Sequence, residues 1–230
     1  EVESLRTFLA ERLSGLTVTR TELAAISALK TFSPSLDDLK GRQVVDVVRR
    51  GKYLALKTMP GASADGGSEN VVHMTVHLSR AGWIRWYEEL KTTKVKLGGK
   101  GPLALRVGFS DGSGCDITEA GTEKRLAVWV VRDLDEIDHV RTLGPDPLGA
   151  SLNAAAIGQL LRSHAGQIKK VLVDQTVLAG VGNAYSDEAL HIARLSPFKH
   201  ANRLSEEEST RLGGAVIEVM SPLNTSTPTP

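Results

Sequence analysis

Hydrophobic positions in the first part of the chain form one helical stretch and then many short strand-like runs. Apolar residues at positions 2, 5, 8, 9 and 13 recur at helical spacing, and Ser14 with Gly15 ends the pattern. Beyond it, strands are predicted at 17–20, 44–49, 53–57, 71–77, 83–87, 103–109, 115–118 and 126–131. Turn-forming segments separate them, for example at 60–61, 65–67 and 111–114. The spacing predicts an antiparallel β-sandwich over residues 1–131 that begins with a helix.

The pattern changes to a helical period after Pro147. A helix is predicted at 152–163, followed by two amphipathic runs at about 168–172 and 185–193 that a turn at 179–183 joins. Ser205 and Glu208 form a capping-box signal for a helix that extends to about Met220. Residues 222–230 show no periodicity and are predicted to be disordered. The fold class is therefore α+β: a sandwich domain at 1–131, a hinge at 132–150, an all-α domain at 151–221 and a tail at 222–230.

Composition adds limits to this picture. Of 230 residues, 41% are hydrophobic, which is enough for a substantial core, and the formal net charge is only +1. Positive charge is therefore local, in clusters at 49–52, 91–100, 124–125 and 169–170 that are either solvated faces or binding patches. The single cysteine, Cys115, excludes an internal disulfide and is expected to be a small apolar core residue. No apolar run approaches the roughly 18 residues of a membrane span, and no signal-peptide pattern is present.

The turn at 179–183, Ala-Gly-Val-Gly-Asn, is the most informative local feature. Glycines let backbone N–H groups approach an anion closely, and the helix that begins there adds the positive end of its dipole. Lys169 and Asn183 can add side-chain donors, so a phosphodiester would fit this site. The alternative is an ordinary helical hairpin whose glycines only permit a sharp bend. A nucleotide-cofactor loop is disfavoured, because a third glycine, a preceding strand and a downstream acidic partner are missing.

The identities of the residues around this turn also favour a phosphodiester site. The run at 168–190, IKKVLVDQTVLAGVGNAYSDEAL, closely resembles the helix–two-turn–helix signature of the formamidopyrimidine-DNA glycosylase and endonuclease VIII family of base-excision repair enzymes. Further segments resemble the family's opening motif (1–3), its lysine-bearing strand (49–54), its His-Leu-Gly-Met-Ser-Gly loop (77–82), its Arg-Arg-Phe motif (124–126) and the join between its domains (143–148). The variants at 80, 118–121 and 126 are most similar to an actinobacterial branch.

The resemblance implies a protein that binds double-stranded DNA carrying damaged bases or abasic sites. Such a protein rotates the damaged nucleotide out of the duplex and clamps the phosphates on either side. The family's pattern assigns phosphate binding to Lys52, Arg125, Lys169, Gly182 and Asn183, with Lys52 also a possible auxiliary catalytic residue. The alternatives are surface charges of little energetic value for the cations, and a left-handed turn residue or helix cap for Asn183.

Two further positions are implied to fill the space that the rotated base leaves. The family commonly has a methionine at the position of Arg80 and an aromatic residue at that of Leu126. Arginine can stack its guanidinium on a base or pair with the orphaned one, whereas leucine can wedge but cannot stack. Alternatively, Arg80 forms a surface ion pair and Leu126 belongs to the core. Both interpretations of Leu126 stay open at this point.

The resemblance also implies an enzyme, a DNA glycosylase with apurinic-site (AP) lyase activity on oxidised bases. In the family, an N-terminal proline attacks the sugar carbon to form an imine, and the glutamate after it shuttles protons. Glu1 aligns with the fifth residue of the opening motif, so the sequence contains neither catalytic residue. Either a few native residues precede Glu1, or the reaction has been lost and the protein is a non-catalytic binder of damaged DNA with the same fold.

Metal binding is not expected of this sequence. Most members of the family end with a four-cysteine zinc finger, whereas this sequence has no Cys-X-X-Cys pair, so zinc would need a finger beyond Pro230. His73 and His77, four residues apart on a predicted strand, are expected to be core or pocket residues rather than ligands. The expected protein is a monomeric, cytoplasmic, nucleoid-associated bacterial enzyme without a cofactor, whose partner is damaged DNA and not a membrane.

Overall fold

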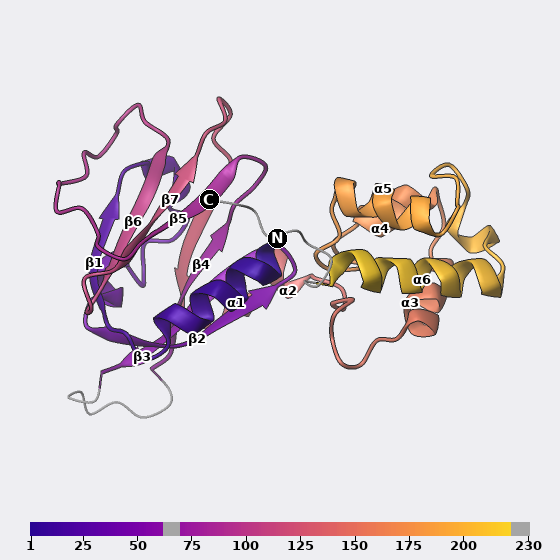
Figure 1. Cartoon of the computed structure of the whole chain (residues 1–230), viewed down its shortest axis with the longest axis horizontal. Helices are drawn as coiled ribbons and strands as arrows, with labels where there is room; N and C mark the ends of the chain where they lie inside the picture. Colours follow the sequence, from indigo (N-terminus) through magenta and orange to yellow (C-terminus); the bar gives the residue numbers. More distant parts are fainter. Residues whose placement is uncertain (62–69, 222–230) are drawn as a thin grey trace. The chain divides into compact units, whose positions relative to one another are not determined.

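The chain divides into two compact units, one formed by Val2–Arg141 and the other by Thr142–Pro230 together with Glu1 (Figure 1). The structure, a computed structural model, describes residues 1–61 and 70–221. The turn predicted at 65–67 and the tail predicted at 222–230 lie outside the described residues. No helix in these two ranges is both long and apolar enough to cross a membrane.

The first unit begins with α1 (Val2–Leu13) and continues through antiparallel sheets. One sheet has the strand order β1 (Val18–Leu23), β6 (Leu103–Phe109), β7 (Gly114–Glu119), β5 (Gly82–Tyr87). The other has the order β2 (Arg42–Arg50), β3 (Tyr53–Pro60), β4 (Val72–His77), β8 (Ala127–Val131). Short 3₁₀ turns at Ile26–Ala28 and Leu36–Leu39 connect β1 to β2. The predicted antiparallel sandwich with an N-terminal helix is confirmed.

The inner faces of the two sheets form one hydrophobic core. Leu54 and Leu56 of β3 lie two residues apart, so both point inward, where Val107 and Ile117 of the other sheet belong to the same cluster. The helix α1 adds Leu9 and Leu13 to that cluster. Cys115 also lies in this core as a free, buried thiol, and burial raises its pKa to about 12. The expectation of an apolar core cysteine is confirmed, and a thiol held protonated in this way is a poor nucleophile.

The segment predicted as a hinge, 132–150, is folded at both of its ends. Its start forms a 3₁₀ turn (Leu134–Glu136) and α2 (Asp138–Arg141), and Ile137 between them and Val140 in α2 are buried. Its end belongs to the helical unit, because Gly144 N–H donates to the Gln175 carbonyl oxygen at 2.9 Å. The apolar pair at 137 and 140 has helical spacing, but a stretch this short does not stand out in a sequence.

The second unit is helical. It consists of α3 (Ala154–Arg162), α4 (Ile168–Val173), α5 (Asn183–Ile192) and α6 (Glu206–Met220), with a 3₁₀ turn at Ala201–Arg203. The predicted capping box is present: Ser205 Oγ accepts from Glu208 N–H at 3.1 Å, and the Glu208 carboxylate accepts from Ser205 N–H at 2.8 Å. The unit has its own core, which Ile157, Leu172 and Leu212 join as fully buried side chains.

The helices α3 and α6 cross at glycines. A Cβ atom at Gly213 would lie 2.0 Å from the Ala154 carbonyl oxygen, and one at Gly158 would lie 2.5 Å from that of Ser209. Backbone therefore packs on backbone at this crossing, without intervening side chains. Gly214, the next residue of α6, differs, because a Cβ there would meet only the Ala154 methyl group at 3.8 Å.

Alanine at the two neighbouring glycines should have opposite effects. Gly213→Ala must push α3 and α6 apart and should lower the free energy of unfolding of the helical unit by roughly 1–3 kcal/mol or more. Gly214→Ala, the matched control, adds a methyl group where there is room and should raise that free energy by about 0.5–1 kcal/mol, because alanine favours a helix over glycine. Urea unfolding followed by circular dichroism measures both; equal effects would contradict the close crossing.

Candidate nucleic-acid interface

Strand pairing collects several loops at one end of the sandwich. Tyr53, the first residue of β3, pairs with His77, the last of β4, and His77 pairs with Ala127, the first of β8. In the other sheet, Gly82 at the start of β5 pairs with Glu119 at the end of β7. The links 78–81 and 120–126 run from one sheet to the other, so these strand ends form a single end of the unit. The loops there carry three of the predicted site residues: Lys52, Arg80 and Arg125.

Lys52 lies in the two-residue turn between β2 and β3. Gly51 adopts a φ of +58°, as the first central position of a type II′ hairpin turn requires. The Lys52 side chain is half-buried and has no carboxylate partner within the described residues, and burial lowers its pKa. The pKa of the neighbouring His77 is lowered mainly by burial of its imidazole, and the positive charge of Lys52 lowers it further. A half-buried ammonium without a counter-charge is costly, so an anion that binds beside it would gain from neutralising it.

Arg125 lies on a loop that a buried carboxylate holds. Glu119 is only 3% exposed, and its Oε1 accepts the backbone N–H groups of Arg125 at 2.9 Å and of Leu126 at 3.0 Å. The side chain of Lys124 donates to the Glu119 backbone carbonyl. The Arg125 guanidinium itself points to solvent and pairs with Glu123 at 2.9 Å. The loop therefore has a fixed backbone and an exposed cation.

The two residues predicted to fill the space left by a rotated base have different surroundings. Arg80 is exposed and follows Ser79, whose φ of +57° lies in the left-handed region. Gly82 closes this loop through its N–H, which donates to the Leu78 carbonyl at 2.9 Å, and a Cβ at Gly82 would collide with that same oxygen. Leu126 is only 2% exposed and belongs to the sandwich core. The structure thus favours the core alternative for Leu126, because its side chain has no path to a ligand in this arrangement.

In the helical unit, the glycine turn is organised by Gln175, a residue that the sequence did not single out. Its Nε2 donates to the carbonyl oxygens of Val173 and Val181, both at 2.8 Å, and its Oε1 accepts from Gly180 N–H at 3.0 Å. Gly180 adopts a φ of +90°, which favours glycine. A single amide side chain therefore holds both ends of the turn, a role that only the three-dimensional contacts reveal.

The turn leads directly into the N-terminus of α5. Gly182 is the N-cap residue and Asn183 the first helical residue, and no side chain caps this end. Within the part of the chain that the structure describes, the backbone N–H groups of Asn183 and Ala184 meet no acceptor. Lys169 reaches across from α4 and pairs with Asp187 at 2.6 Å, with the two side chains 34% and 58% exposed. Donors and one exchangeable cation are thus concentrated at the predicted phosphate site.

The histidines show no arrangement typical of a metal centre. His73 Nδ1 lies 3.2 Å from the Arg132 carbonyl oxygen, and the His77 ring packs against Tyr53 with 4.8 Å between ring centroids. Burial lowers the pKa of both imidazoles. In residues 1–61 and 70–221, no three His, Cys, Asp or Glu side chains gather where they could hold a metal ion.

Both units match domains of known proteins. Residues 1–114 match the formamidopyrimidine-DNA glycosylase N-terminal domain, and residues 143–223 match the formamidopyrimidine-DNA glycosylase H2TH domain. The formamidopyrimidine-DNA glycosylase of Prochlorococcus marinus is 30% identical over 236 residues, covering 96% of this chain and 77% of that protein. That of Heliobacterium modesticaldum is 33% identical over 227 residues, covering 96% and 76%.

Solved structures agree with these relatives. The MutM (Fpg) protein of Thermus thermophilus superposes with a TM-score of 0.73 at 29% identity, covering 95% of this chain and 72% of that one. The Fpg of Lactococcus lactis, non-covalently bound to DNA that contains an AP site, gives a TM-score of 0.76 at 26% identity, covering 95% and 78%. Sequence, fold and motif order lead to one assignment: the chain belongs to the formamidopyrimidine-DNA glycosylase family.

Proposed function

We propose that the protein is a base-excision repair DNA glycosylase with AP lyase activity, which removes oxidised bases from double-stranded DNA in the bacterial cytoplasm. Family membership supports the reaction class. The observation that carries the DNA-binding part is Lys52, a half-buried cation without a carboxylate partner in the described residues. A DNA phosphate supplies the negative charge that the protein itself does not place there.

Each unit carries its own proposed phosphate contacts. Lys52 and Arg125 would hold phosphates from the loops at the end of the sandwich. Gly182 and Asn183 would offer backbone and side-chain donors at the start of α5, and Lys169 would add a charge. Holding the backbone on both sides of a lesion allows the nucleotide to rotate out of the stack, at a cost of a few kcal/mol. Arg80, exposed on its tight loop, would then occupy the vacated space.

The proposed chemistry is that of an N-terminal amine. The amine nitrogen attacks C1′ of the flipped nucleotide, the bond from C1′ to the base breaks, and the base leaves with a proton. The C1′–O4′ bond of the sugar then breaks, O4′ takes up a proton, and C1′ and the nitrogen form a protonated imine. This imine acidifies the C2′–H bond, so loss of that proton expels the 3′ phosphate and cleaves the strand. The proposal places the proline nucleophile and its glutamate partner on residues ahead of Glu1. Lys52 would assist only as a neighbouring cation.

Removing the Lys52 charge should weaken DNA binding. Lys52→Ala should raise the Kd for a duplex with a tetrahydrofuran abasic analogue about tenfold, and should lower the slope of log Kd against log salt by about 0.9 for one lost phosphate contact. Because burial lowers the pKa of Lys52, the parent protein should begin to lose affinity at a pH below that at which an ordinary lysine deprotonates. The variant should lack this part of the pH dependence.

Lys57→Ala is the matched control, because it removes the same charge from β3, the strand that follows Lys52, away from the turn. Fluorescence anisotropy across a salt series and a pH series measures all three proteins. If Lys52→Ala and Lys57→Ala weaken binding equally, Lys52 has no specific phosphate contact.

Releasing Lys169 from its internal partner should strengthen binding. Asp187→Asn removes the carboxylate that competes with a DNA phosphate for the ammonium group, and we expect the Kd for the abasic-analogue duplex to fall several-fold. Glu188→Gln removes one negative charge from the next position of α5 and controls for the change in net charge. An equal gain from both variants would mean that only overall charge matters, and that Lys169 does not bind DNA.

Covalent trapping tests the enzyme assignment. Borohydride reduces an imine to a stable amine, so the full-length protein incubated with an abasic duplex and borohydride should give an adduct of lower mobility in denaturing gels. The control is the same protein with an uncleaved N-terminal tag, in which the terminal amine is no longer at the sugar. Specific binding to the abasic duplex without any adduct would overturn the lyase and favour a non-catalytic damage-binding protein.

A further inference from the structure

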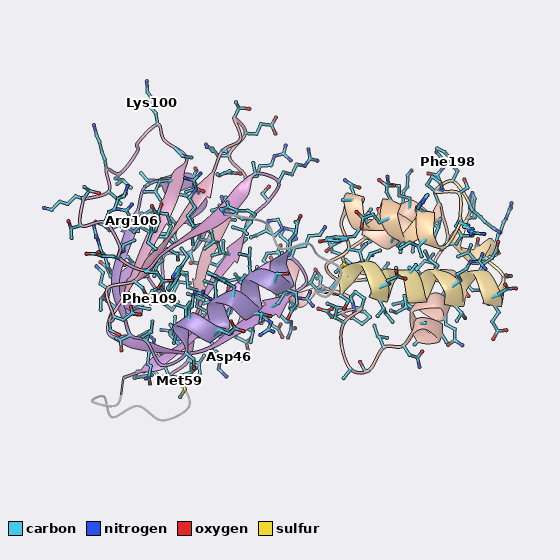
Figure 2. All side chains as sticks on the ribbon, in the orientation of Figure 1. Asp46, Met59, Lys100, Arg106, Phe109 and Phe198 are labelled. Carbon is cyan, nitrogen blue, oxygen red and sulfur yellow. The ribbon has the colours of Figure 1, made fainter. Side chains whose placement is uncertain are left out.

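A lysine-rich loop lies on the outer face of the β1–β6–β7–β5 sheet. Between β5 and β6, residues 91–101 carry Lys91, Lys94, Lys96 and Lys100, all of them exposed. The sequence contains no Asp or Glu from residue 90 to residue 110. None of the four ammonium groups meets a carboxylate in the described part of the chain. Figure 2 shows Lys100 extending outward from this loop, while Arg106 lies among the strands.

Two arginines, Arg106 and Arg20, fix the backbone of this loop. Arg106, 7% exposed, makes a two-pronged pair with Asp116 at 2.7 and 2.8 Å, and its remaining nitrogen donates to the Thr93 carbonyl at 3.1 Å. Arg20 donates to the carbonyl oxygens of Lys91 and Thr93, both at 3.0 Å, and pairs with Glu22 at 2.6 Å. These acidic groups neutralise the anchoring arginines and leave the loop lysines uncompensated.

Strand register makes this anchor a continuous row. Glu22 of β1 is paired with Arg106 of β6, which is paired with Asp116 of β7, so the three side chains lie across adjacent strands. Further along the loop, Gly98 N–H donates to the Ala24 carbonyl at 2.8 Å. A segment with almost no buried residues is therefore held at several points. Such fixation is not needed for a solvated face, whose lysines tolerate any backbone position.

The loop ends beside the predicted phosphate-binding end of the sandwich. Glu119 N–H donates to the Pro102 carbonyl at 2.7 Å, and the Glu119 side chain holds the backbone of Arg125. The lysine-rich loop and the loop that carries Arg125 are therefore neighbours within one unit. Together they present positive charge over a longer stretch than a single phosphate clamp needs.

We propose that the loop at 91–100 is an additional contact for the DNA backbone, and that Arg20 and Arg106 are positioning residues that hold its lysines in place for phosphates. This proposal rests on the proposed function, because it takes DNA as the ligand. The lysines would contact phosphates and not bases, so this contact raises affinity for damaged and intact duplex alike.

The first test removes loop charge. Lys96→Ala with Lys100→Ala should raise the Kd for abasic-analogue duplex and for intact duplex by a similar factor, about tenfold or more at moderate salt, and should lower the salt slope by roughly 1.8 for two phosphate contacts. The matched control, Lys40→Ala with Lys57→Ala, removes the same charge from the same unit outside the loop. A loop variant that behaves like this control overturns the proposal.

The second test asks whether the anchor acts through the lysines. Arg20→Gln with Glu22→Gln leaves the net charge unchanged and removes the guanidinium of Arg20, which donates to the carbonyl oxygens of Lys91 and Thr93. It should increase amide hydrogen exchange in 91–101 and weaken DNA binding. Added to a variant in which Lys91, Lys94, Lys96 and Lys100 are all alanine, it should cause no further loss, because the lysines it positions are then absent. Additive losses would overturn the positioning role.

In both tests, failure of the parent protein to prefer abasic duplex would count against the proposed function, whereas unchanged loop variants with that preference intact would count only against this inference.

Discussion

Burial of the two sheets against each other is the constraint on which the sandwich unit depends. Leu54 of β3 and Val76 of β4 are register partners and are 3% and 2% exposed. A one-residue slip of β3 would turn Leu54 and Leu56 away from the core and move Tyr53 and Lys57 inward. Since Lys52 lies two residues before Leu54 in the same hairpin, the hydrophobic core also fixes where the Lys52 ammonium lies. The position of a charged group is thus determined by apolar contacts.

The buried carboxylates of the sandwich bind backbone N–H groups and arginine side chains. They are therefore not available to neutralise the lysines at the surface. Glu119 accepts two loop N–H groups, and Asp116 pairs with Arg106 inside the sheet. A buried carboxylate of this kind is stable only because its charge is fully hydrogen-bonded. Among the residues that the structure describes, no carboxylate pairs with Lys52 or with the lysines at 91–100. A nearly neutral chain with a net charge of +1 can in this way present a strongly positive surface at one end of a unit.

Local patterns in the sequence were sufficient to predict most of the fold. Residues with strong periodicity gave α1, the strands of both sheets and the capped start of α6, because burial follows the period of the element. Contacts between distant residues were not accessible in this way. Gln175 bridging the glycine turn, Glu119 holding the loop at 125–126 and Asp187 paired with Lys169 involve side chains whose types suit many roles. The same ambiguity left Leu126 open until its burial was known.

The predicted phosphate-binding cations fall into two physical classes. Lys169 and Arg125 carry internal carboxylate partners, but these pairs are partly exposed and each is worth roughly 0–1 kcal/mol, so exchanging the partner for a phosphate costs little. Lys52 has no partner to release in the described residues, and its half-buried charge gains more from a phosphate. The division between the two classes follows from burial rather than from residue type, because Lys52 and Lys169 carry the same ammonium group.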